Sequence, residues 1–210
     1  MTEFNTKNRI RMFTAALVLV LAVYACAAFT YFEAASDSVR NGVVRMHILA
    51  NSDSEADQQV KLCVRDALLE MSAQNCKGDI SKQEAAEYFE NEAADITELA
   101  ESVLKENGFT YGASTKLCRE YFTTRRYGDL TFPAGIYTSV KVELGEGKGH
   151  NWWCVMFPPL CVPAAEKVTA DGEGFDLLTD SGEKIITNGE KYAVRFKIVE
   201  WYEWLRDNLR

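Results

Sequence analysis

The stretch from residue 145 to 161, GEGKGHNWWCVMFPPLC, gathers the residue types of this chain that could do chemistry. Its three glycines suit a phosphate-binding loop, and His150 with Cys154 suits a thiol nucleophile and its base. A phosphate loop needs a following helix and a Ser or Thr after its lysine. Here a glycine follows Lys148 and the next run is strand-like, so the sequence argues against nucleotide binding.

A thiol hydrolase is the more serious alternative, because a Cys-His pair with an orienting third group suffices for nucleophilic catalysis. Along an extended strand, positions i and i+4 lie about 13 Å apart at ~3.3 Å per residue, so His150 reaches Cys154 only through a turn. His47 could serve instead from another strand. An exported Cys-His hydrolase acting on cell wall or peptide substrates therefore stays open.

A disulfide between Cys154 and Cys161 is the third possibility. Seven positions apart on one straight strand, the two side chains would face opposite sides, so the bridge requires a chain reversal, which Pro158-Pro159 can supply. Closing this short loop would stabilise the fold by roughly 2 to 3 kcal/mol in the chain-entropy model. Free thiols at both positions are the alternative.

The cysteines and histidines give no sign of a metal site. The chain has six cysteines and two histidines without CxxC or Cys/His ligand spacing, so neither a metal nor a cofactor is expected. Five of the cysteines follow the apolar N-terminal segment, and this odd number leaves at least one free or paired between chains. Besides Cys154 and Cys161 they are Cys63, Cys76 and Cys118.

An uncharged segment of 21 residues, from 12 to 32, is long enough to cross the ~30 Å hydrocarbon core of a membrane as a helix. Basic residues precede it, so residues 1–11 are expected as a cytoplasmic stub and residues 38–210 as an extracytoplasmic domain. Ala25-Cys26-Ala27 has the form of a signal peptidase site, so an uncleaved anchor and a cleaved signal peptide are both open. The body is acidic, in a chain of net charge −8, which argues against nucleic acid as a partner.

The exported part begins with a strand and a helix. Alternating apolar residues predict a strand at 44–50, with His47 half-exposed on its polar face. A capping box that begins at Ser52 predicts a helix over 53–74. Cys63 falls within the apolar pattern of that helix and is expected to be a small buried side chain.

A second long helix is predicted over 82–107. Ser81 and Glu84 form its capping box, and Gly108 supplies a left-handed stop. Many carboxylates lie along one face of this helix. Spread along a solvated face they need only water, so they are not interpreted as a metal or acid-base site.

The second half of the chain changes to shorter, alternating runs. Strands are expected within 109–126, over 136–144 and over 151–157, with a further strand at 192–198 that leads into a C-terminal helix. The glycine-rich and aspartate-rich residues 164–190 read as a flexible insertion or an extra hairpin. The expected fold class is α+β, one domain with two long N-terminal helices, an antiparallel sheet and a C-terminal helix.

Three blocks of this sequence resemble a known family. RMHILANSDSEADQQVKLCVRDALL, FPAGIYTSVKVELGEGKGHNWWCVMFPPLC and VRFKIVEW look like stage II sporulation protein R of endospore-forming Firmicutes. The resemblance covers most of residues 43–201 and is weak over 164–190. Its most specific part is the block from Asn-Trp-Trp-Cys to Phe-Pro-Pro-Leu-Cys.

The resemblance implies a signalling protein and not an enzyme. Members of this family are made in the forespore and exported towards the space between the two sporulation membranes. There they switch on a membrane-embedded aspartic-type protease of the mother cell, which removes the pro-sequence of an inactive sigma factor. A purely structural spore-envelope protein is a further alternative.

The aromatic block has the composition of a protein-binding surface, because interfaces are enriched in tryptophan and depleted in charge at their centre. The expected partner-binding residues are Trp152, Trp153, Phe157, Pro158 and Pro159. Neighbouring side chains of a strand point to opposite faces. We therefore expect one tryptophan to be buried and the other to join the Pro-Pro turn in the contact.

Overall fold

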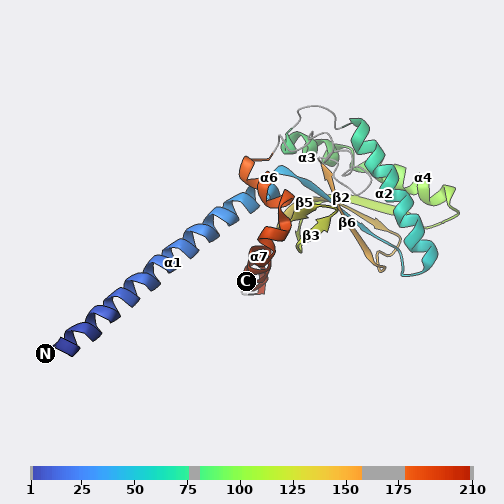
Figure 1. Cartoon of the computed structure of the whole chain (residues 1–210). Coiled ribbons are helices and arrows are strands. Elements are labelled where there is room, and N and C mark those ends of the chain that lie inside the picture. The colour runs from blue at the N-terminus through green and yellow to red at the C-terminus, as the bar shows by residue number, and fades with distance from the viewer. Residues whose placement is uncertain (1, 76–80, 158–177, 209–210) are drawn as a thin grey trace.

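A long helix leads into a body in which helices cover both faces of a four-stranded sheet (Figure 1). The structure is a computed structural model that describes residues 2–75, 81–157 and 178–208. The sheet order is β2-β5-β1-β6. Its strands are β1 (Val44–Leu49), β2 (Ala113–Phe122), β5 (Gly135–Leu144) and β6 (Asn151–Phe157). The expected α+β class is confirmed.

The sheet is mixed. β2 pairs antiparallel with β5, and β6 pairs antiparallel with β1, whereas the two central strands β1 and β5 run parallel. A parallel pair needs a long crossover, and the helices and β2 that lie between β1 and β5 in the chain supply it. The expectation of an antiparallel sheet thus holds for the two outer pairs and fails for the central pair.

One face of the sheet is covered by α2 (Glu55–Asn75), α3 (Lys82–Asn91) and α4 (Ala93–Glu106). Apolar stripes at helical spacing meet the inward positions of the strands there. The buried side chains of this first core include Met46, Ile48, Val64, Leu68, Phe89, Ile96, Val140 and Val142.

The helix ends follow local sequence signals. At α3 the capping box is present, because Ser81 Oγ accepts from the Glu84 amide at 3.2 Å and Glu84 Oε2 accepts from the Ser81 amide at 2.7 Å. The single helix expected over 82–107 is divided at Glu92 into α3 and α4. Gly108 has the expected positive φ, +83°.

α2 departs from expectation at its start and on one side. Ser54, and not Ser52, caps it, since Ser54 Oγ accepts from the Asp57 amide at 3.1 Å. Cys63 is exposed, so the prediction of a buried thiol is wrong. The stripe that faces the core is Val60, Val64 and Leu68, and Cys63 lies about 100° from its centre at 3.6 residues per turn.

The opposite face is covered by the last turns of α1 (Thr2–Gly42), by β3 (Arg125–Tyr127) and β4 (Leu130–Phe132), and by α6 (Asp180–Thr187) and α7 (Gly189–Asn208). These elements form a second core. Its buried side chains include Phe32, Val39, Phe122, Phe132, Tyr137, Val155, Ile185 and Phe196.

The C-terminal region is helical where the sequence predicted strand and turn. Residues 180–187 form α6, and residues 192–198 belong to α7. Tyr192, Phe196 and Val199 recur at helical spacing, and the rings of Tyr192 and Phe196 lie 5.7 and 5.2 Å from that of Phe32. Packing of this helical face against α1 stabilises the helix, although the alternating pattern of the sequence predicted a strand. Residues 164–177 of the expected insertion lie outside the described residues.

α1 joins the apolar N-terminal segment to the body. Within the described residues, Lys7–Gly42 is the one helix long and apolar enough to cross a membrane. Its N-terminal part projects away from the body (Figure 1) and its apolar side chains there are exposed. Phe32, Ala35 and Val39 are buried in the second core. The body therefore includes α1 residues ahead of the expected start at residue 38.

Candidate partner-binding surface

Two loops meet at the end of the sheet where the parallel central strands β1 and β5 both terminate. The loop at 145–150 contains the glycines of the aromatic block, and it pairs with the loop that follows β1. The amides of Gly149 and Lys148 donate to the carbonyls of Ala50 and Asn51 at 2.8 and 3.2 Å. The Glu146 amide donates to Asn51 Oδ1 at 3.0 Å. The glycine turn is thus fixed by a distant segment of sequence.

The glycines of this turn serve conformation and close approach. Gly145 and Gly147 have φ of +57° and +60°, a region that side chains disfavour. At Gly149 an added Cβ would collide with the backbone carbonyl of Ser52. The glycines therefore allow a tight contact between the two loops, and this contact explains their presence without a phosphate-binding role.

A buried carboxylate, Asp57 at the start of α2, holds the loop after β1 in place. It accepts hydrogen bonds from Asn51 Nδ2 at 3.0 Å, from Ser52 Oγ at 2.5 Å and from the Tyr111 hydroxyl at 2.5 Å. Burial alone would raise the pKa of Asp57, but these hydrogen bonds hold that pKa below its ordinary value. Burial, and then the carboxylate, raise the pKa of Tyr111.

His150 belongs to the same turn and is largely exposed. Its backbone amide donates to Asp53 Oδ1 at 2.6 Å, and its Nδ1 lies 2.5 Å from the same oxygen. Lys61 Nζ donates to the His150 carbonyl at 3.0 Å, and burial lowers the pKa of this lysine. The imidazole is therefore directed to Asp53.

Cys154 does not offer a nucleophile. It is fully buried among the apolar side chains of the first core, and it is disulfide-bonded. Of the other described cysteines, Cys26, Cys63 and Cys118 are free. Cys161, the expected partner, lies outside the described residues, as does Cys76, so the pairing stays a prediction.

Trp152 and Trp153 point to opposite faces of β6, as a strand requires, but both are half-buried. Trp152 packs at the margin of the first core, with the guanidinium carbon of Arg65 4.5 Å from its ring centre. Trp153 stacks on His47 with ring centres 3.6 Å apart. The expectation of one buried and one outward tryptophan is wrong, because each has a side chain from another element packed on its ring.

His47 is buried and not half-exposed as expected, with 5% of its surface accessible. Its Nδ1 lies 2.9 Å from Glu120 Oε2 and its Nε2 lies 3.0 Å from Asn151 Oδ1. Burial raises the pKa of Glu120, but hydrogen bonds from His47 and Ser139, together with the charges of His47 and Lys141, hold that pKa below its ordinary value. The stack on Trp153 and these two contacts join β1, β2 and β6.

A buried arginine fixes the backbone beneath the two tryptophans. Arg45 is fully buried, and its Nε donates to the Cys154 carbonyl at 2.9 Å. Its Nη2 donates to the Tyr127 hydroxyl at 2.8 Å, and that hydroxyl donates to the Trp153 carbonyl at 3.0 Å. The ring of Phe122 lies 4.4 Å from the guanidinium carbon, a cation–π contact.

The other predicted contact residues do not extend this surface. Phe157 is 2% exposed and belongs to the first core, so its assignment to a partner contact is corrected. Pro158 and Pro159 lie outside the described residues. The surface that we call the β6 edge comprises Asn151, Trp152, Trp153, Arg65 and the loop 145–150.

The residues that sequence reasoning missed are those that hold the β6 edge: Arg65, Asn51, Asp57, Glu120 and the buried Arg45. None carries a motif of its own. Asn51 and Asp57 fall in the block HILANSDSEAD, whose run of small polar residues after a strand was interpreted only as a helix start. Arg45 contacts a carbonyl group 109 residues away in sequence, at Cys154.

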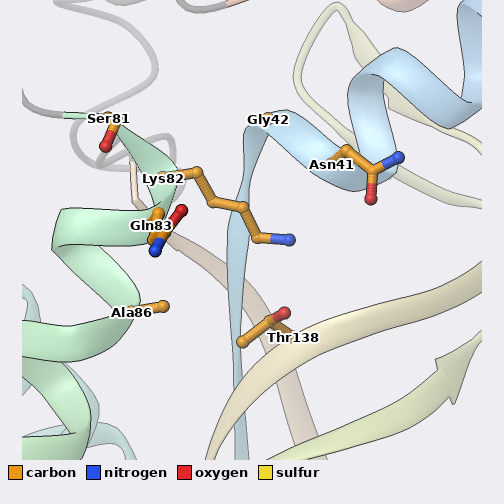
Figure 2. Close-up of a pocket in the computed structure, with 7 residues that line it drawn as sticks. All are labelled: Asn41, Gly42, Ser81, Lys82, Gln83, Ala86 and Thr138. Carbon is orange, nitrogen blue, oxygen red and sulfur yellow. The ribbon is translucent and has the colours of Figure 1, made fainter.

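A separate hollow lies at the opposite end of the parallel strands. Figure 2 shows Lys82 reaching across it from α3 towards the end of α1, where its Nζ donates to the Arg40 carbonyl at 3.5 Å. Burial and the charge of Arg119 lower the pKa of Lys82. The lining residues of this hollow of about 540 Å³ are Asn41, Gly42, Ser81, Lys82, Gln83, Ala86 and Thr138. Its lining has one cation and no carboxylate, so it offers no acid-base pair.

Neither place resembles a metal centre. Among residues 2–75, 81–157 and 178–208, no group of three or more His, Cys, Asp or Glu side chains could hold a metal ion. At the β6 edge, Trp152 packs against Arg65 and Trp153 against His47. This arrangement suits recognition of another protein.

The comparisons with known proteins agree with the sequence resemblance. The family model described as stage II sporulation protein R matches residues 40–167. A curated relative of that name from Bacillus subtilis (strain 168) is 38% identical over 118 residues, which are 56% of this chain and 53% of the relative. The chain thus spans about half the length of that relative. No solved structure matches.

Proposed function

Because the chain belongs to the stage II sporulation protein R family and so serves in sporulation, we propose that it is an exported forespore signal. In this proposal it activates a membrane-bound aspartic-type protease of the mother cell. The protease then processes the inactive precursor of the mother-cell sigma factor. The chain acts by binding and does no chemistry of its own.

Family membership supports this proposal most, and the topology is compatible with it. The apolar segment of α1 suits export as a signal or an anchor, and the acidic body follows it. The space between the forespore and mother-cell membranes is the location that this role requires.

In the described residues, the cysteine and the two histidines that suggested a hydrolase make structural contacts instead. Cys154 is disulfide-bonded, and the imidazole of His150 is directed to Asp53. His47, the other histidine, is held by Glu120 and Asn151 and stacked on Trp153. These contacts explain both histidines as structural supports of the β6 edge.

We further propose that the β6 edge contacts the protease. Tryptophan and arginine are the residue types most enriched at binding hot spots. Trp152 and Arg65 form such a pair, and the backbone beneath them is held by the buried Arg45. A preorganised surface of this kind loses little conformational entropy on binding.

The test is co-expression of the full chain with the candidate protease and its pro-sigma substrate in a non-sporulating bacterial host. Immunoblots would follow the shortening of the pro-sigma factor. We expect cleavage only when the chain is present. Equal cleavage with and without the chain would refute the signalling role.

The contact surface is tested in the same host with Trp152→Ala and Arg65→Ala. Loss of a hot spot costs about 2 kcal/mol or more, so activation should fall roughly 30-fold or more at limiting chain. Arg126→Ala is the matched control, because Arg126 is an exposed arginine whose ion pairs lie at the surface. Melting curves establish that the variants fold. If folded W152A and R65A activate like R126A, the contact lies elsewhere while the signalling role stands.

A further inference from the structure

α7 has two apolar faces, and only one of them is packed. Phe196 and Val199 are buried in the second core. On the other side, Val194, Ile198 and Trp201 are 74%, 47% and 63% exposed. At 100° per residue these three side chains fall within about 60° of one another, so they form one stripe along the helix.

Two more aromatic side chains flank this stripe near the C-terminal end of α7. Tyr202 is 44% exposed and Trp204 is 57% exposed. Lys197 is exposed on the same side of the helix, with its Nζ 3.0 Å from Glu200 Oε2. Large apolar and aromatic side chains with a flanking lysine are the composition of a helix that lies in a membrane interface.

The C-terminal end of the stripe lies close to the apolar segment of α1, and this position indicates which surroundings the stripe meets. The ring of Tyr202 lies 6.0 Å from that of Phe29, in an edge-to-face contact. Phe29 belongs to the last turn of the uncharged segment 12–32, so Tyr202 sits at the level where that segment would leave the bilayer.

α7 also runs in the required direction. Its first turns contact Phe32 through Tyr192 and Phe196, and its later turn contacts Phe29. The later turns of α7 therefore lie closer than its first turns to the level of the apolar segment. Figure 1 shows the N-terminal part of α1 and the C-terminal end of α7 leaving the body on the same side.

We propose that the exposed face of α7 lies in the outer interface of the membrane that α1 enters, with Trp201 and Trp204 as its anchors. The membrane is the occupant because the C-terminal end of the stripe lies next to Tyr202, whose ring contacts Phe29 of the apolar segment, where lipid would be the surrounding medium. This contact would fix the tilt of the body over the membrane. The inference concerns lipid and does not depend on the proposed protease.

The test uses the full chain reconstituted into phosphatidylcholine vesicles whose lipids are brominated near the top of the acyl chains, because bromine quenches tryptophan at that depth. The chain has four tryptophans. If two of them lie in the interface, wild type should lose about half of its emission relative to unbrominated vesicles. W201F/W204F, which changes two exposed positions, should keep nearly all of its emission.

W152F/W153F is the matched variant, since it retains only the two tryptophans of α7 and should be quenched more strongly than wild type. Circular dichroism establishes that each variant folds. If W152F/W153F does not fold, the comparison of wild type with W201F/W204F is sufficient to test the proposal. Equal, weak quenching of wild type and W201F/W204F would overturn the proposal. So would a chemically cross-linked dimer that W201F/W204F abolishes without any quenching in wild type, because the stripe would then bind a second copy.

Discussion

Removal of the Asp57 carboxylate should destabilise the body more than any other single polar change at the loop contact. Three side chains donate to this buried group. A hydrogen bond to a charged group contributes about 1.5 to 3 kcal/mol, but Asn51 and Ser52 are half-exposed and can regain water. We therefore expect Asp57→Ala to lower the free energy of unfolding by about 3 kcal/mol.

Asp57→Asn should cost less, about 1 kcal/mol, because it keeps one acceptor oxygen for Ser52 and Asn51. Its amide nitrogen would face the Tyr111 hydroxyl, which can accept as well as donate. The two substitutions therefore separate the loss of charge from the loss of the acceptor. At 2 to 4 °C per kcal/mol for a body of this size, Asp57→Ala should lower the melting temperature by about 6 to 12 °C.

The pH dependence supplies an independent check. Because the folded pKa of Asp57 lies below 3.8, its stabilisation is present above pH 3.8 and is lost as the pH falls through the folded pKa. The difference between wild type and Asp57→Ala should shrink over that acid range. Urea unfolding of the full chain in detergent, followed by circular dichroism, measures it.

Asp66→Ala is the control, because Asp66 is an exposed carboxylate on the same helix, paired with Arg65 at 2.7 Å. Its cost should stay below about 0.5 kcal/mol. If Asp57→Ala is no more destabilising than Asp66→Ala at pH 7, the carboxylate does not hold the two loops together and the reasoning is refuted.

Three further outcomes follow from the geometry. Glu120→Gln should lower the free energy of unfolding by about 1 to 2 kcal/mol at pH 7. The difference from wild type should begin to shrink below pH 4.5 and vanish only below the folded pKa of Glu120, which is depressed beneath 4.5; urea titrations check both. Iodoacetamide should label Cys63 in the native, non-reduced chain and leave Cys154 unlabelled by mass spectrometry, and ready labelling of Cys154 would revive the thiol hydrolase. Gly149→Ala should cost about 1 to 3 kcal/mol, because its Cβ meets the backbone of the neighbouring loop; an unchanged melting temperature would contradict that contact.

Local signals predicted much of the fold. The capping box at Ser81 and the left-handed stop at Gly108 need only neighbouring residues, and both are present. The alternating run 136–144 gives β5 because its side chains meet two different cores. The two helix signals depend on interactions within a few residues, and the strand is marked by its alternating pattern, so a single sequence contains all three signals.

Competition between two periods explains the main error. In α7, Tyr192, Val194, Phe196 and Ile198 alternate as in a strand, while Tyr192, Phe196 and Val199 recur as in a helix. The helix forms, with the rings of Tyr192 and Phe196 packed on Phe32 and with Val199 buried in the second core. Val194 and Ile198, the two residues of the alternating set that do not face the second core, remain exposed. They form the first part of the stripe that ends at Trp201.

The supports of the β6 edge could not be predicted for a different reason. Arg45, His47 and Asp57 are polar residues on elements that looked half-exposed, and their burial depends on partners far away in sequence. Arg45 needs the Tyr127 hydroxyl and the Cys154 carbonyl, and His47 needs Glu120 and Asn151. Only the register of the assembled sheet brings these groups together.

The junction between α1 and the body bears on the open question of cleavage. The first α1 residue that packs on the second core is Phe29, followed by the buried Phe32, Ala35 and Val39. Arg40 adds a hydrogen bond to the Ala134 carbonyl at 2.9 Å and an ion pair with Glu33. The small-residue site at Ala25-Cys26-Ala27 lies just before all of these contacts. A cut there would remove the bilayer span and leave the core intact, so the folded body suits an anchored and a released chain equally. In the released chain, the aromatic face of α7 would be the remaining contact with lipid.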